Sequence, residues 1–318
     1  MFNEANWDQA PGLTEGALNL KLDAKTCDLN YWIKAVAQGT WMGLENGHRP
    51  GAVTPAYMQE AGPLRDALYE ELAFRTVAEH MATRALPYLI INAPTTETME
   101  FYLTQTVDEA RHSAVFRGHL FELGVVESDL PHLIETYARE QIDSVLKPLE
   151  AWMLEIVRDN ADFLGGVVLF TILIEGLLAP AAEISERKWR LIDPAGAEIE
   201  KGANIDEIRH LTVGASIIKE HLEKFPEDRA HVLNVIKAGV EKWESLPTDE
   251  VVLRREKLFQ EGMMAHKELL ESYELIPGVR LIDTTPEQRL DIAVQMTKEL
   301  QIGRLNYMNL EEAIDWLV

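Results

Sequence analysis

Two short segments of the sequence repeat the same pattern of acidic and basic side chains. TVDEARH ends at His112 and NIDEIRH ends at His210, so both contain Asp-Glu-x-Arg-His. Positions three apart lie on one face of a helix, so Glu109 with His112, and Glu207 with His210, can each reach a single metal ion. One such pair would be ordinary in a glutamate-rich chain. Two copies that also share the aspartate and the arginine indicate a metal-binding site.

Each pair needs a further carboxylate to complete its half of a metal centre. Glu79 precedes the first motif by about the length of a helical hairpin, which would bring it level with Glu109. Glu175 is the only charged residue within the apolar segment 163–182. A buried, unpaired carboxylate is costly unless it is protonated or binds a cation. A protonated or ion-paired core glutamate is the alternative for Glu175, and a surface glutamate is the alternative for Glu79.

Two lone carboxylates and two Glu-x-x-His pairs form the ligand set of a dinuclear carboxylate centre in a helical bundle. Carboxylates and imidazoles suit iron or manganese, whereas structural zinc sites favour thiolates, and Cys27 is the only cysteine. We therefore predict these metal ligands: Glu79, Glu109, His112, Glu175, Glu207 and His210.

The aspartate of each motif precedes the histidine by four residues. We expect Asp108 to accept a hydrogen bond from His210, and Asp206 to accept one from His112, in a crossed arrangement that fixes the orientation of each imidazole. Arg111 and Arg209 could neutralise these aspartates. The alternative is that both arginines lie on a solvated face.

The segments that carry the motifs are predicted to be helical, which makes the fold class all-α. The sequence predicts one domain over 1–318, with a metal-binding core over about 60–275 and a peripheral part over 276–318. A small hairpin or ordered loop is expected near residue 194, where Asp, Pro, Ala and Gly follow one another. The tail should contain two short amphipathic helices. The predicted helices are 62–91 with a break at Pro87, 96–123 ended by Gly124, 129–158, 161–189, 204–224, 227–245 and 248–273.

Composition narrows the classes of partner. The formal charge of -23 disfavours nucleic acid and anionic membrane surfaces. The lone cysteine and the absence of a signal-like start favour a cytoplasmic protein. The apolar segment 163–182 is long enough to span a membrane, but Glu175 and the lack of flanking basic clusters favour a buried helix in a bundle.

At the metal motifs the sequence resembles the ribonucleotide-reductase-small-subunit-like branch of ferritin-fold carboxylate oxidases. The stretch FYLTQTVDEARHSAVFRGHLFELGV is similar to that branch, notably to its ligand-binding oxidases, and IEGLL and DEIRH follow in order. The resemblance covers about residues 60–275. It implies a ferritin-like helical bundle, two iron ions per chain or a manganese and iron pair, reaction with O2, and a homodimer.

Three positions depart from better-defined members of that branch. Phe116 stands where reductase subunits carry a radical-bearing tyrosine, which excludes a stable tyrosyl radical there. Phe170 stands where ligand-binding oxidases have a cross-linking tyrosine, and Ala203 replaces a histidine of arylamine N-oxygenases. The remaining relatives are small-molecule oxygenases, including the azoxy-forming enzyme of valanimycin biosynthesis. The resemblance favours N-oxygenation of an amine, hydroxylamine or hydrazine.

The predicted function is that of a non-haem di-iron oxygenase that takes electrons from outside. No nucleotide-binding glycine motif is present, so we expect no bound nucleotide or flavin and an external ferredoxin or flavin reductase as partner. A radical-generating subunit with an Fe/Fe or Mn/Fe centre is the main alternative, and iron storage is a weaker one. Four residues are candidates to wall an apolar substrate pocket, although a purely structural role is open for all of them: Phe116, Phe170, Leu173 and Ile174.

Overall fold

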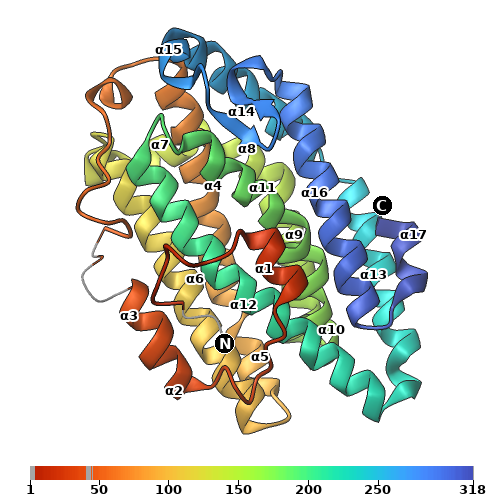
Figure 1. The fold of residues 1–318 in the computed structure, drawn as a ribbon. Coiled ribbons are helices and arrows are strands. Elements are labelled where there is room, and N and C mark those ends of the chain that lie inside the picture. The colour runs from red at the N-terminus through yellow and green to blue at the C-terminus, as the bar shows by residue number, and fades with distance from the viewer. Residues whose placement is uncertain (1–3, 41–43, 45, 318) are drawn as a thin grey trace.

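The computed structural model describes residues 4–40, 44 and 46–317, and it confirms the all-α prediction (Figure 1). Within those ranges the only strands are β1 (Glu274–Ile276) and β2 (Val279–Arg280), which pair antiparallel. They lie within the tail segment that was predicted to be a loop. Every other regular element is helical.

Four helices carry the predicted ligands: α4 (Pro63–Ala85), α6 (Thr96–Glu122), α11 (Glu175–Trp189) and α12 (Pro194–Lys224). Helix α4 packs along α6, α11 packs along α12, and α6 also contacts α12. The predicted boundaries of the first two helices hold. Proline at the first turn begins α4, Thr95 caps α6 by accepting from the backbone N–H of Thr98, and Gly124 follows α6 with a φ of 96°. Pro87 starts the separate helix α5 (Pro87–Asn92), as expected from the break.

The apolar segment is helical and largely internal, but it is not a regular α-helix. Helix α10 (Phe163–Val168) leads into a π-helical turn (Leu169–Ile174), and α11 follows. Of the described residues, the span Phe163–Trp189 alone is long and apolar enough to cross a membrane, and 72% of its apolar window is buried in the protein. The π-turn lies directly before Glu175, and such turns occur often at functional sites.

The hairpin expected near residue 194 is wrong. Pro194 occupies the first turn of α12, which begins ten residues before the predicted start. Asp193 precedes it, and its carboxylate accepts from the His119 ring at 2.6 Å and from the Thr54 hydroxyl at 3.0 Å. Aspartate before proline suits a helix N-terminus as well as a turn, because proline at the first helical position lacks only an N–H that would be unsatisfied there.

The C-terminal part differs from the prediction of two short helices. Helix α16 (Pro286–Tyr307) is a single 22-residue helix, capped by Thr285, and only α17 (Ile314–Leu317) is short. Helix α16 packs against α11, and the amide of Gln301 donates to the backbone oxygen of Ile172 at 2.8 Å. In Figure 1 it runs along the flank of the bundle beside α13 and α17.

The remaining helical segments surround this arrangement. The region predicted as one helix over 129–158 is broken at Ala138 and contains two π-helical turns. The N-terminal helices α2 and α3 lie near α6 at one side of the bundle in Figure 1. These elements are α1 (Leu13–Asn19), α2 (Leu29–Tyr31), η1 (Trp32–Val36), α3 (Ala37–Thr40), η2 (Ala56–Gln59), η3 (Glu127–Asp129), α7 (Leu130–Tyr137), α8 (Arg139–Gln141), η4 (Ile142–Leu146), α9 (Lys147–Leu154), η5 (Glu155–Asp159), η7 (Pro226–Asp228), α13 (Arg229–Glu244), α14 (Thr248–Met263), η8 (Met264–His266), α15 (Lys267–Leu270), η9 (Leu281–Asp283) and η10 (Glu311–Ala313).

Candidate metal centre

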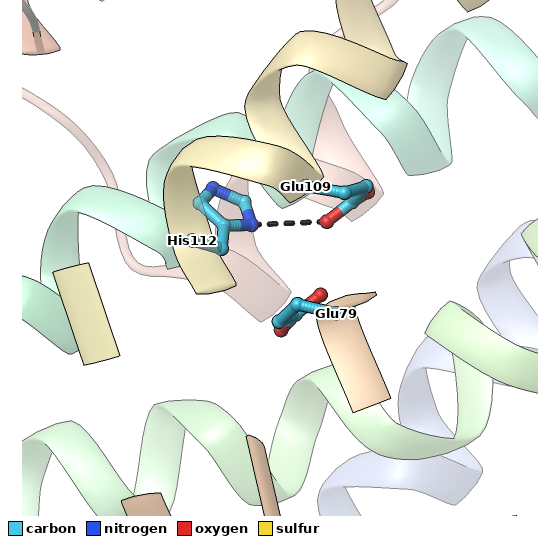
Figure 2. A group of neighbouring side chains, drawn as sticks. All are labelled: Glu79, Glu109 and His112. Carbon is cyan, nitrogen blue, oxygen red and sulfur yellow. Dashed lines mark hydrogen bonds and ion pairs between the residues drawn. The ribbon is translucent and has the colours of Figure 1, made fainter. Parts of the chain in front are cut away.

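Five of the six predicted ligands form two overlapping groups. Glu79, Glu109 and His112 place one potential ligand atom each within 4.8 Å of one another, and so do Glu109, Glu207 and His210. Figure 2 shows the first group, in which His112 and Glu109 come from one helix and Glu79 faces them from another. Glu109 belongs to both groups. A carboxylate in this position could serve two metal ions at once.

Both imidazoles present the same nitrogen to the carboxylates. His112 Nδ1 lies 3.0 Å from Glu109 Oε2, and His210 Nδ1 lies 3.3 Å from Glu109 Oε1. His210 Nδ1 is also 3.5 Å from Glu207 Oε2. Each histidine therefore approaches a different oxygen of Glu109, and in both cases the approaching atom is Nδ1.

Glu175 lies next to these groups without belonging to either. The side-chain amide of Gln105 donates to its Oε1 at 2.5 Å. Gln105 precedes Glu109 by four residues and so occupies the same face of α6, which the spacing alone could have shown. Glu175, Glu79, Glu109 and Glu207 all line one cavity.

Crowded carboxylates dominate the electrostatics of this cavity. Burial and the neighbouring Glu109 raise the pKa of Glu79 well above its usual value. Burial and the neighbouring Glu207 do the same to the pKa of Glu175. Burial acts against the charged form of His112, but hydrogen bonding to Asp206 and Glu109 outweighs it and raises the pKa of His112 to about 10.

Behind the histidines, the crossed arrangement expected from the sequence is present. His112 Nε2 lies 3.1 Å from Asp206 Oδ2, and His210 Nε2 lies 3.3 Å from Asp108 Oδ2. Since Nδ1 of each ring faces the glutamates, an Nε2–H that donates to aspartate leaves the Nδ1 lone pair available to a metal.

The two motif arginines are buried and pair with these aspartates. Arg111 donates to Asp206 at 2.5 Å, and Arg209 donates to Asp108. The alternative of a solvated face is therefore wrong for both arginines, which are 4% and 0% exposed.

The N-terminal segment completes this buried network. Arg209 also pairs with Glu4, and the Trp32 indole N–H donates to Asp108 Oδ1 at 2.8 Å. Burial raises the pKa of Glu4 to about 7, despite the opposing charge of Arg209. The metal-binding core predicted from about residue 60 onward leaves out Glu4 and Trp32. Their contacts form only in the folded chain, so no local pattern in 1–59 indicates them.

The glutamates open onto a cavity of about 180 Å³, here called the site cavity. Two of the four residues predicted to wall a pocket, Phe170 and Ile174, line it. Phe116 and Leu173 do not: both are fully buried in the apolar core, Phe116 beneath the Arg75 guanidinium, whose central carbon lies 5.7 Å from the ring centroid, and Leu173 against Gly239 of α13. More of the apolar wall comes from η4, α9, α11 and α14: Val145, Leu146, Leu149, Leu178, Val251 and Val252.

Polar residues that the sequence analysis did not single out also line the site cavity. Arg75 is one turn from Glu79 on α4, so helical spacing could have identified it. Asn204 is likewise one turn from Glu207 on α12, whereas Arg255 and Trp243 come from distant segments and gave no such signal. Ala203 lines the cavity too, at the position where the resemblance to arylamine N-oxygenases would imply a histidine.

The donor set fits two divalent metal ions. Four carboxylates face one cavity, and two imidazoles reach Glu109 through Nδ1. Glu207 Oε2 and His210 Nδ1 are buried and lie 3.5 Å apart, but neither forms a hydrogen bond of good geometry with any described residue. Bound cations would satisfy these atoms and offset the crowding of acidic groups that, together with burial, raises the pKa values of Glu79 and Glu175.

In comparisons with known proteins, no family model matches the chain and no curated protein matches it significantly.

Proposed function

We propose that the protein is a dinuclear-iron oxygenase that activates O2 and oxidises a small, largely apolar molecule within a ferritin-like bundle. The observation that carries this proposal is the pair of ligand groups that share Glu109 at the wall of an apolar cavity. A metal centre that opens onto such a cavity can meet a bound substrate and dioxygen away from bulk water.

The side chains have distinct roles in this proposal. Glu79 with His112, and Glu207 with His210, would hold one ion each, Glu109 would be shared between them, and Glu175 would complete the carboxylate set. Asp108 and Asp206 hold the Nε2 protons and so orient the imidazoles. Iron bound there would supply the reduction of dioxygen, which the protein's own side chains cannot perform. The apolar wall excludes water from the reacting groups.

The cavity favours an oxygenase over a radical-generating subunit. A subunit that only generates a radical for a partner protein needs a redox-active side chain near the metals more than it needs a substrate cavity. No tyrosine is among the described residues that line the site cavity, although Trp243 does line it, and Phe116 stands at the position where the resemblance implies the radical-bearing tyrosine. N-oxygenation, azoxy formation, an external reductase and a homodimer remain proposals that rest on the sequence resemblance.

Metal content is the first test. After anaerobic reconstitution with ferrous iron, the wild type should hold about two iron ions per chain by elemental analysis. Glu109→Ala should lose most of both, because both ligand groups depend on it, whereas Glu79→Ala should retain more. His80→Ala is the matched control, since His80 is the next residue on α4 and is exposed.

Admission of air to the ferrous-loaded protein should then consume O2 faster than the same amount of free iron does. A wild type that binds no iron, or that binds as much after Glu109→Ala as before it, would contradict the metal centre. Binding of two iron ions without accelerated O2 consumption would contradict the oxygenase and leave a metal site of another kind. Iron loading far beyond two per chain would favour storage.

A further inference from the structure

Arg255, which lines the site cavity, forms fewer ion pairs than the two cations beside it. Arg75, Lys188 and Arg255 converge on the carboxylate of Glu71, at 3.4, 3.9 and 3.7 Å. Glu71 is fully buried, and Ser185 and the Trp189 indole N–H also donate to it. A single carboxylate is thus shared by three positive side chains.

Two of these cations form a second ion pair and the third does not, although its charge also acts on the more distant Glu70 and Glu200, against the rise that burial causes in their pKa values. Arg75 pairs with Glu200 at 2.9 Å, and Lys188 pairs with Glu256. Arg255 has no other carboxylate within ion-pair distance and no hydrogen-bond partner among residues 4–40, 44 and 46–317. Its side chain is only 14% exposed. A buried guanidinium with five donors and one distant partner has unused capacity for an anion.

The helix that carries Arg255 directs it into the site cavity. Thr248, Val251, Val252 and Arg255 all line the cavity, and their spacing places them on one face of α14. The neighbouring Arg254 does not line it: that side chain pairs with Glu70 and Glu140 instead. One face of α14 therefore offers an apolar wall that ends in a cation.

The distance between Arg255 and the predicted metal ligands limits the length of a molecule that could bind between them. Glu71, which Arg255 contacts, precedes the metal ligand Glu79 by eight residues on α4, or about 12 Å along the helix axis. An anionic group at Arg255 is thus about two helical turns from the ligand groups. Between them the wall is mostly apolar.

We infer that Arg255 binds the carboxylate of a substrate whose apolar body extends along the site cavity toward the metal ligands. A guanidinium matches a carboxylate with two parallel hydrogen bonds. The four glutamates repel an anionic group from the opposite end, so the charge fixes the direction in which the molecule enters. That this ligand is the substrate rests on the proposed oxygenase function; that a carboxylate binds at Arg255 does not.

Sodium octanoate and 1-octanol are suitable probes, because they differ in the charged group and share an apolar chain. Their binding is measured by isothermal titration calorimetry on the iron-loaded protein under anaerobic conditions. Wild type should bind octanoate about tenfold or more tightly than octanol. Arg255→Leu should abolish this preference and leave octanol binding unchanged, whereas Arg255→Lys should retain part of it.

Arg254→Leu is the matched control and should keep the full preference. Arg255→Leu is expected to fold, since Glu71 retains its other four partners, and thermal unfolding checks this. Equal binding of the two probes by wild type, or an unaltered preference in Arg255→Leu, would overturn the inference. So would a preference that disappears when iron is removed by a chelator, because the carboxylate would then be binding the metals. If the protein proves to bind no iron, a preference that still depends on Arg255 retains the carboxylate site while the oxygenase proposal fails.

Discussion

The two faces of the motif histidines have opposite electrostatic character. Behind the rings, Asp108 and Asp206 are each paired with an arginine and a histidine, and all of these side chains are buried. In front of the rings, Glu109 and Glu207 contact the two histidines, but Glu79 and Glu175 have no cation within ion-pair distance among the described residues. The chain itself therefore compensates the charges behind the rings, whereas it compensates those in front only in part.

This difference separates the parts of the network that hold the fold from those that hold a ligand. Ion pairs within the chain are complete as soon as the protein folds, so their loss should lower stability whether or not metal is present. Carboxylates that repel one another should instead cost stability in the metal-free protein and contribute once cations bind. Variants on the two faces are therefore expected to respond differently to metal.

The largest effect should come from breaking the compensated face. Asp206→Ala removes the carboxylate that Arg111 and His112 share, which leaves two buried donors without that acceptor. Loss of one partner of a buried ion pair costs about 3–5 kcal/mol. The free energy of unfolding, measured by denaturant titration, should fall by that amount in the metal-free protein.

Asp143→Ala serves as the control, because Asp143 forms exposed pairs with Lys147 and Arg139 that should contribute little. A similar small change for Asp206→Ala would show that the buried pairs do not stabilise the fold. Loss of metal without loss of stability would place Asp206 in the ligand-holding part of the network instead.

The ion pairs behind the histidines could be predicted from the sequence because the residues that form them lie within the two short motifs. Each motif carries an aspartate, an arginine and a histidine on one helix, and these residues find their crossed partners once the two helices pack together. Glu4 and Trp32 escaped prediction because they reach the network through tertiary packing alone. Arg255 escaped for the same reason, since no motif connects α14 to α4.

The error near residue 194 has a different origin. The residues Asp-Pro-Ala-Gly satisfy the requirements of a turn and of a helix start equally well. His119, 74 positions away, contacts the Asp193 carboxylate at this helix start. The π-turn before Glu175 could not be predicted from the sequence either, because the surrounding apolar residues show no periodic pattern that distinguishes an α-helix from a π-helix.

A second compensated cluster allows the comparison to be extended outside the metal centre. The His119 ring lies between Asp193 at 2.6 Å and Glu122 at 2.8 Å, and His48 also contacts Glu122. Burial opposes the charged form, but hydrogen bonding to Asp193 and Glu122 prevails and raises the pKa of His119 to about 9.

A raised histidine pKa stabilises the fold below the unfolded value of about 6.5, and this contribution is lost as pH rises through about 9. The difference between wild type and His119→Gln in the free energy of unfolding should therefore shrink by up to about 3 kcal/mol between pH 6 and pH 9.5. Denaturant titrations at both pH values measure it. A difference that is constant with pH would mean that folding does not shift the pKa of His119.

The smallest effect, and the only stabilising one, is expected on the uncompensated face. Glu175→Gln keeps an acceptor for Gln105, whose amide donates to Glu175 Oε1, and removes one negative charge from the cavity. Because burial and Glu207 raise the pKa of Glu175, the folded metal-free protein binds a proton more tightly there than the unfolded chain does. Its stability should therefore fall as pH rises above the unfolded glutamate value of about 4.5.

Glu175→Gln should remove part of that fall and stabilise the metal-free protein by about 1–2 kcal/mol at pH 7.5. With ferrous iron present the order should reverse, because the variant lacks a carboxylate ligand and gains less from binding. Thermal unfolding of both proteins with iron and with a chelator measures the four values needed. If Glu175→Gln destabilises the protein equally in both conditions, the charge of Glu175 is already compensated within the chain, and the two faces do not differ as described.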